Sequence, residues 1–136
     1  MPITLQARII QSNNITRTLN DIGRRVEARS LAANRYVGDE AVKLLRAPSV
    51  SQVNVDTGLM RRSFYFRASR DARNIQILNT AHSEGGFFYP NVIERRFGGV
   101  ARTIQQNRQR IAQRASFNLR ERPDPPARLP RELPFR

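Results

Sequence analysis

The sequence predicts an α+β fold in which a long N-terminal helix and a C-terminal amphipathic helix pack on a small antiparallel β-sheet. Apolar residues recur every three or four positions from residue 15 to 44 and again from 100 to 119, which is the spacing of one helical face. Between these stretches, residues 63–68 and 74–79 alternate in the period of two that is typical of strands. The length of 136 residues suits one domain, which we place at residues 1–121.

The N-terminal part predicts a strand followed by a helix. Residues 3–9 alternate apolar and polar side chains, so they are expected to add a half-buried strand to the sheet. A helix of about 30 residues from Ile15, about 45 Å long, should follow. Gly23 and Gly38 lie inside it, and each costs roughly 1 kcal/mol relative to alanine, so a bend or break is expected near either. Pro48 ends the helix.

The middle of the chain predicts a loop and a β-hairpin. Residues 49–58 are polar and end in the turn signal Asp-Thr-Gly, which is typical of an exposed connection. The two strand-like runs that follow are joined by the short polar segment 69–73, so they should pair as a hairpin.

The C-terminal part predicts a short helix and a longer one. Pro90 suits the first turn of a helix through Arg96, and Gly98-Gly99 supplies its end. The longer helix runs from about Val100 to Arg122. Its apolar residues lie on one side, and four arginines lie on the other: Arg102, Arg110, Arg114 and Arg120.

Residues 122–136 contain five prolines with arginines between them, a composition that favours an extended, polyproline-like arm. Three apolar side chains, Leu129, Leu133 and Phe135, could anchor the arm on another subunit. The alternative is a frayed tail, since chain ends are commonly disordered. The prolines lower the entropy cost of docking, and both interpretations stay open.

The net charge of +13 points to an anionic partner. Lys43 is the only lysine, and arginine pairs bidentately with phosphates and carboxylates. A GC-rich genome would explain the choice of arginine over lysine but not the excess over acids. No acid occurs between Val100 and Leu119, whereas a solvated face usually mixes both signs. The cationic face is therefore expected to meet DNA or an acidic protein surface.

Several classes of protein are disfavoured. The chain has no cysteine, so neither disulfides nor thiolate metal sites are expected. No apolar run approaches the roughly 20 residues that span a bilayer, and the N-terminus lacks signal-peptide features, so a soluble, unexported chain without a membrane partner is expected. No Walker-type loop, zinc spacing or dinucleotide fingerprint occurs, so no cofactor is expected.

An enzyme is not expected. His82, the only histidine, stands beside Ser83 and Glu84, but neighbours in a glycine-bearing loop seldom converge on one substrate atom. Asp56 and Glu94 could pair as acid and base, although a simpler interpretation has Asp56 capping a turn and Glu94 partnering an arginine.

The aromatic run Phe87-Phe88-Tyr89 could stack on nucleic-acid bases. Membership of the core or of a subunit contact is the favoured interpretation, since aromatic side chains tend to be buried.

Two segments carry a resemblance to a known family. They are residues 55–63, Val-Asp-Thr-Gly-Leu-Met-Arg-Arg-Ser, and residues 89–99, Tyr-Pro-Asn-Val-Ile-Glu-Arg-Arg-Phe-Gly-Gly. Placed after a helical region and before a terminal arm, they resemble the small neck, or head-to-tail joining, proteins of tailed bacteriophages. The likeness covers roughly residues 15–120 in the order of features. Pro90 and the doubled arginine Arg95-Arg96 depart from the family pattern, so the slot within the neck stays open.

The resemblance implies a structural virion protein, assembled in the host cytoplasm, that forms a homo-oligomeric ring, six-fold or twelve-fold, around the DNA channel. Such a ring joins the portal or adaptor assembly to the tail, as a head-tail connector or a tail-completion (terminator) protein. Seven residues are the candidates for subunit contacts: Asp56, Thr57, Gly58, Leu59, Leu129, Leu133 and Phe135. The four arginines of the last helix would face DNA or an acidic ring. Deleting residues 123–136 is expected to leave a folded subunit that assembles poorly, because the arm shows no evident place in the core.

Two other functions remain as alternatives. A small basic DNA-binding protein would use the same charge and would bind free DNA with a steep dependence on salt. A toxin-like nuclease, the weaker alternative, would depend on His82, so alanine at that position should abolish cleavage.

Overall fold

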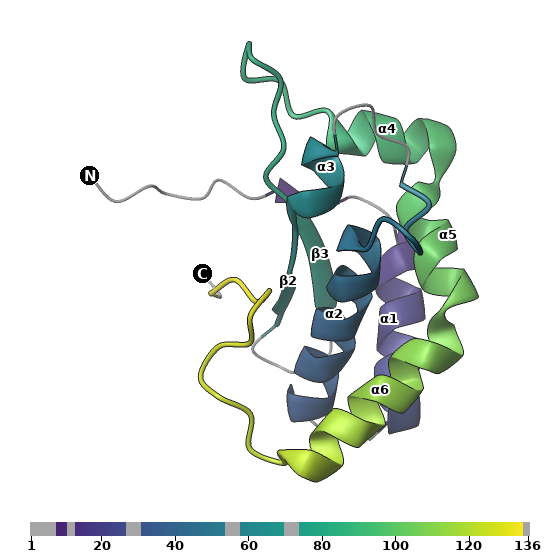
Figure 1. Cartoon of the computed structure of the whole chain (residues 1–136), viewed down its shortest axis with the longest axis vertical. Coiled ribbons are helices and arrows are strands. Elements are labelled where there is room, and N and C mark those ends of the chain that lie inside the picture. The colour runs from purple at the N-terminus through teal and green to yellow at the C-terminus, as the bar shows by residue number, and fades with distance from the viewer. Residues whose placement is uncertain (1–7, 11–12, 27–30, 54–57, 70–73, 135–136) are drawn as a thin grey trace.

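The computed structural model describes residues 8–10, 13–26, 31–53, 58–69 and 74–134 (Figure 1). Within these ranges the chain forms six helices and one three-stranded antiparallel sheet, which confirms the predicted α+β class. The elements in chain order are β1 (Arg8–Ile9), α1 (Asn13–Val26), α2 (Leu31–Arg46), α3 (Leu59–Arg62), β2 (Phe64–Ala68), β3 (Ile75–Asn79), α4 (Pro90–Phe97), α5 (Gly99–Gln106) and α6 (Arg108–Glu121).

The sheet has the order β1-β3-β2, with β3 in the centre. Strands β2 and β3 pair from Phe64 opposite Asn79 to Ala68 opposite Ile75, which confirms the predicted hairpin. The first strand adds only a short pairing, with Arg8 opposite Asn79. The rest of the strand predicted over residues 3–9 lies outside the described residues. Strand β2 thus stands at an edge of the sheet.

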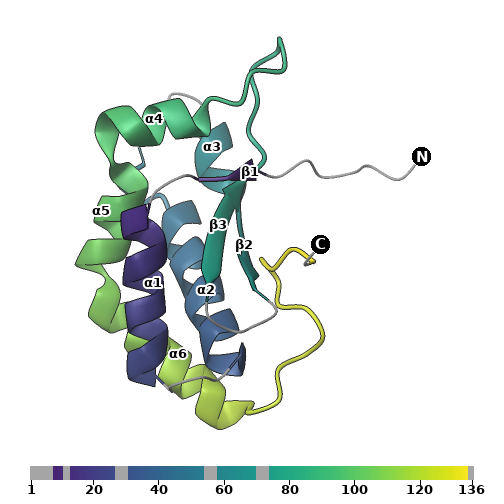
Figure 2. The ribbon, with the colours of Figure 1, turned by 180° about the vertical axis from the view of Figure 1, so that it is seen from behind.

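The prediction of one long N-terminal helix is wrong. Helix α1 ends at Val26, helix α2 begins at Leu31, and the two lie side by side against the sheet (Figures 1 and 2). Residues 27–30 between them lie outside the described residues. The apolar spacing continues through both helices because each needs an apolar stripe, and periodicity alone does not reveal that the chain turns back between two stripes.

The predicted break does occur near Gly23, since α1 ends three residues later at Val26, whereas α2 continues through Gly38 without a break. Both glycines mark close approaches. A Cβ at Gly23 would collide with the side chain of Asn34, where α1 meets α2. A Cβ at Gly38 would lie 2.8 Å from Cγ of Phe66, a fully buried residue of β2. The missing side chain at Gly38 therefore lets α2 rest directly on the sheet.

Alanine at Gly38 should destabilise the fold. Overpacking a core costs about 1–3 kcal/mol in stability. We expect a cost at the upper end for the overlap between the new Cβ and the Phe66 ring, because Phe66 is fully buried. That cost exceeds the gain of about 1 kcal/mol in helix propensity. Urea unfolding measures the difference. The exposed Gly85, where a Cβ would meet nothing closer than 4.0 Å, is the matched control, and equal midpoints for the two alanine variants would contradict the packing account.

The predicted C-terminal helix is also two helices. Helix α5 ends at Gln106, and Asn107 adopts φ −113° and ψ 19° before α6 begins. The backbone N–H of Asn107 still makes a helical bond to the carbonyl of Thr103, but its side-chain amide donates to the same carbonyl, at 2.8 Å. Such local side-chain bonds compete with continuation of a helix. The apolar stripe itself is confirmed, since Ile104 and Ile111 are buried.

The domain has three layers. The sheet forms one, the pair α1 and α2 covers one face of it, and α5 with α6 covers the other side of that pair (Figures 1 and 2). Helix α2 is central, since it contacts β2, β3, α1, α5 and α6. The arginine-bearing helices therefore lie in the outer layer, and α5 is on the side of the molecule away from β2. No helix among the described residues is long and apolar enough to cross a membrane.

Candidate functional site

The four arginines predicted to face a partner are all exposed on α5 and α6. We call Arg102, Arg110, Arg114 and Arg120 the arginine face. The ion pairs between described residues join Arg24 to Asp21, Arg35 to Glu132 and Arg131 to Asp39, and none includes the arginine face. Arg102 donates one hydrogen bond, of 2.6 Å, to the carbonyl of Phe97. Among the described residues the arginine face therefore forms no ion pair, and the carboxylate near it is that of Glu94, beside Arg102.

A groove of about 450 Å³ opens beside the arginine face, between α1 and α5. Three arginines line it: Arg17, Arg102 and Arg108. The single acid in its lining, Asp21, is already paired with Arg24. The Nε of Arg108 is buried and has no hydrogen-bond partner. The groove is therefore a concave, cationic surface suited to an anionic group.

Sequence reasoning missed Arg17 and Arg108. Arg17 belongs to α1, far from the last helix in sequence, and only the packing of α1 on α5 brings it close. Arg108 follows Ile104 by four residues, which places it at the border of the apolar stripe rather than opposite to it. A helical-wheel analysis that included stripe borders could have found Arg108, but no local signal points to Arg17.

Glu94 lies near Arg102, as the simpler sequence interpretation expected, but its hydrogen bonds go to the backbone. Its carboxylate accepts hydrogen bonds from the backbone N–H groups of Val100, at 2.7 Å, and Ala101, at 3.1 Å. It therefore caps the start of α5 across the left-handed Gly98. Burial raises the pKa of Glu94, and the two amides and nearby Arg102 partly oppose the rise. The cap also occupies the anion-attracting end of α5.

His82 and Ser83 are both engaged within their own loop. The Nδ1 of His82 lies 2.7 Å from the carbonyl of Thr80, and its ring packs on Phe88, with centroids 5.3 Å apart. The hydroxyl of Ser83 accepts a hydrogen bond from the N–H of Phe87. These contacts stabilise the conformation of the loop in which both residues lie. Among the described residues, no cluster of three or more metal-ligating side chains occurs.

The three consecutive aromatic residues have different environments. Phe88 is buried in the core, Tyr89 packs against it, and Phe87 is 59% exposed. Burial raises the pKa of the Tyr89 hydroxyl, with nearby Arg62 opposing the rise. A stack of three rings on bases does not fit this arrangement, and Phe87 alone is presented to solvent.

The first group of subunit-contact candidates is only partly described. Asp56 and Thr57 lie outside the described residues. Gly58 has a left-handed backbone, φ 78°, at the start of α3, a conformation that favours glycine. Leu59 packs against this chain's own core, and its carbonyl accepts a hydrogen bond from the hydroxyl of Ser63. This segment therefore builds a tight turn into β2.

The second group lies on the C-terminal arm, and the structure seats the arm on its own domain. Leu129 is 6% exposed and belongs to the core cluster. The N–H of Phe66 donates to the carbonyl of Arg131, and the N–H of Leu133 donates to the carbonyl of Phe66, so the arm runs parallel to β2 at its edge. Phe135 lies outside the described residues. The premise that the arm has no place in the core is wrong, because Leu129 fills one.

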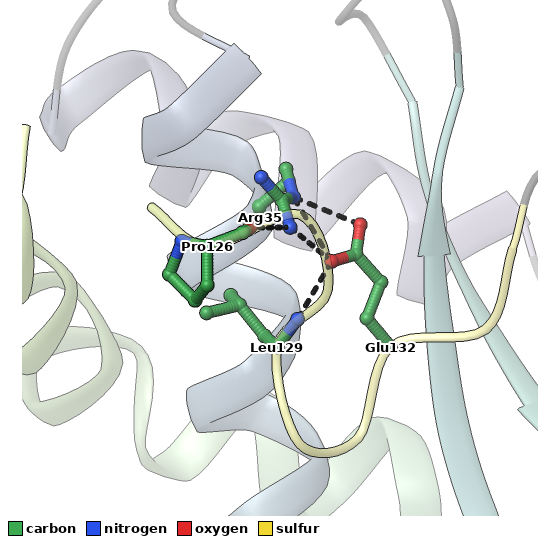
Figure 3. A network of polar contacts seen from close by, with 4 residues as sticks. All are labelled: Arg35, Pro126, Leu129 and Glu132. Atoms are coloured by element: carbon green, nitrogen blue, oxygen red, sulfur yellow. Dashed lines mark hydrogen bonds and ion pairs between the residues drawn. The ribbon is translucent and has the colours of Figure 1, made fainter. Parts of the chain in front are cut away.

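Side chains of α2 hold the arm in place (Figure 3). The Nε of Arg35 donates to both carboxylate oxygens of Glu132, at 2.9 and 3.0 Å, and its Nη2 reaches the carbonyl of Pro126 at 2.8 Å. The same carboxylate of Glu132 accepts from the N–H of Leu129. Both members of the ion pair are mostly buried, with side chains 12% and 13% exposed. A bidentate, partly buried pair of this kind specifies one position of the arm.

A second ion pair joins Arg131 of the arm to Asp39 of α2 at 3.1 Å. Burial raises the pKa of Asp39, and the Arg131 guanidinium opposes the rise. The hydroxyl of Tyr36 also donates to the carbonyl of Arg122, at 2.7 Å, where the arm begins. Helix α2 thus contacts the arm along much of its length, with one ion pair of each polarity: Arg35 of α2 with Glu132, and Asp39 of α2 with Arg131.

No protein-family model, curated protein or solved structure matches this chain. Its function is therefore inferred from its own motifs, charges and contacts.

Proposed function

We propose that this protein is a structural virion component of a tailed phage that forms a ring in the neck and joins the portal or adaptor assembly to the tail. The motif order that resembles neck proteins supports this role. In the ring, the arginine face would lie toward the DNA channel or an acidic neighbouring ring. The arm and the turn that ends at Leu59 would lie at contacts between subunits.

The observation that carries the proposal is the exposed arginine face on α5 and α6 together with an arm docked at the edge of the sheet. Helix α5, which carries Arg102, lies on the side away from β2, and the arm leaves the end of α6 and runs along the β2 edge (Figures 1 and 2). A ring subunit around DNA needs a cationic surface for the channel and a separate surface for its neighbours. An arginine face without ion pairs among the described residues suits the channel, and the arm would supply the contact with neighbours.

Gold labelling tests this location. Antibody-gold bound to purified particles from the source lysate should appear at the head-tail junction in electron micrographs. A tail-tip or capsid protein detected in parallel confirms that the particles are intact. Absence of the protein from finished particles, with intact protein in the lysate, would overturn the neck role.

A small basic DNA-binding protein is the second candidate. The groove lined by Arg17, Arg102 and Arg108 favours it, because three arginines around one concave surface suit a phosphate backbone. Such a protein would bind DNA outside any particle.

A further inference from the structure

The attachment of the arm is concentrated in one short segment. Residues 129–133 supply the buried leucine, both ion pairs and both main-chain bonds to Phe66. All these contacts join the arm to a site made by α2 and β2, and none depends on the arm belonging to the same chain. The arm of a second copy would make the same contacts at the same site.

The docking site is matched to this arm by charge. In a chain with only 11 acidic residues, three carboxylates and one amine of the domain line the hollow of about 320 Å³ beside the arm: Asp39, Glu40, Glu121 and Lys43. Arg122 and Arg131 of the arm line the same hollow. Glu132 presents the opposite sign to Arg35. The site therefore recognises the arm through charges at defined positions as well as through Leu129.

The connection between α6 and the docked segment, residues 122–128, is short and mostly exposed. Its six exposed residues are Arg122, Pro123, Asp124, Pro126, Ala127 and Arg128. The carbonyls of Arg122 and Pro126 accept hydrogen bonds from side chains of α2. At about 3.1 Å per residue, residues 122–128 would reach about 20 Å when extended. Prolines hold such a connection extended, which lowers the entropy cost of reaching outward.

From these contacts we infer that the arm exchanges between copies: residues 129–133 of one subunit occupy the α2–β2 site of the next. In the closed form the arm occupies the site of its own chain. The closed and exchanged forms share every contact of residues 129–133, so they differ only in the connection and in local concentration. A short flexible tether gives its own site an effective concentration on the order of millimolar. The free protein is therefore monomeric at micromolar concentration, and exchange begins when an assembly holds copies side by side.

Arm exchange rests on the proposed function only for the event that brings copies together. The ability of the arm to exchange is tested with purified charge variants, so the test is independent of gold labelling. A failed exchange test would leave the neck location standing, and an absence from particles would leave the exchange result standing.

Charge reversal across the Arg35–Glu132 pair tests exchange. In the single variants Arg35→Glu and Glu132→Arg, arm and site carry like charges, so neither chain closes on itself. In an equimolar mixture, the unaltered Glu132 arm of the first variant meets the unaltered Arg35 of the second, and the introduced charges form the reversed pair. We expect monomers from each single variant and a complex of twice the monomer mass from the mixture, measured by light scattering after size exclusion.

The double variant, Arg35→Glu with Glu132→Arg, is the matched control and should be monomeric because its pair is restored within one chain. Circular dichroism confirms that each variant is folded. A mixture of folded single variants that stays monomeric would overturn exchange. Dimers of either single variant alone would also overturn arm exchange. The arm and the site of such a variant carry like charges, so its dimers would have to form through contacts other than the one between residues 35 and 132.

A variant with a shortened connection decides the matter if the charge variants do not fold. Deleting residues 124–127 removes about 12 Å of reach but leaves the Leu129 segment and its site unchanged apart from the bond to Pro126. We expect this variant to form dimers or closed rings, because its arm no longer reaches its own site. A folded monomer would overturn arm exchange.

Discussion

A chain that ends at Glu121 should unfold at a clearly lower denaturant concentration than the full chain. The truncation removes Leu129 from the core and uncovers the edge of β2 at Phe66. Burying a leucine is worth about 1.5–3 kcal/mol, and each hydrogen bond adds about 1 kcal/mol net. The entropy of ordering the arm offsets part of this gain, and the prolines reduce that offset. We expect a net loss of about 2 kcal/mol or more in the free energy of unfolding.

The truncated chain should also aggregate more readily, because an uncovered edge strand offers unpaired backbone groups to other chains. Urea unfolding by circular dichroism and light scattering of the native protein measure the two effects. Leu129→Ala should reproduce part of the stability loss with the arm still present. Arg128→Ala, at an exposed position of the same arm, should not. Equal unfolding midpoints for truncated and full chains would show that the docked arm contributes nothing to the fold.

Neutralising Arg110 and Arg114 to glutamine should weaken DNA binding at least about tenfold in low salt. Each phosphate contact contributes about −0.9 to the slope of log affinity against log salt on duplex DNA. Loss of two contacts should therefore make that slope shallower by about 2. Fluorescence anisotropy with a short duplex, measured at several salt concentrations, gives both quantities.

The matched control is the pair Arg62→Gln and Arg128→Gln, which removes the same charge from exposed positions off the arginine face. Its affinity should fall far less. If both double variants lose affinity equally, net charge rather than the arginine face governs binding.

The same variants separate the two candidate functions in infection. Loss of DNA affinity with normal particle assembly would favour the DNA-binding protein, whereas defective joining of heads to tails would favour the neck role.

The sequence predicted individual elements well where the signal was local. The hairpin could be predicted because the alternation at Phe64, Phe66, Ile75 and Ile77 reflects burial on one face of a sheet. The exposed side of the last helices appeared because period 3.6 separates Ile111 from the arginines. The same local signals led to the prediction of one helix where the structure has two, both for α1 and α2 and for α5 and α6. The apolar periodicity continues from the first helix of each pair into the second, so it does not mark where the first helix ends.

The candidate site was predictable only in part, for the same reason. The exposure of the arginine face follows from spacing within one helix. The groove needs Arg17 beside Arg108, and the arm site needs Arg35 beside Glu132, 97 positions apart. No pattern within a window of 10 to 20 residues carries such a pairing. The capping role of Glu94 was likewise hidden, because it depends on a turn at Gly98 that aims a side chain back at α5.

The sequence by itself determined the α+β class, the hairpin, the uncompensated positive charge and the proline-rich character of the arm, because composition and local periodicity act within single segments. Only the tertiary structure decided that α1 and α2 lie side by side, that Gly38 admits Phe66, and that Leu129 fills this chain's own core. Those features depend on which surfaces meet, and packing between distant segments sets them through shape and buried area rather than through the order of residues.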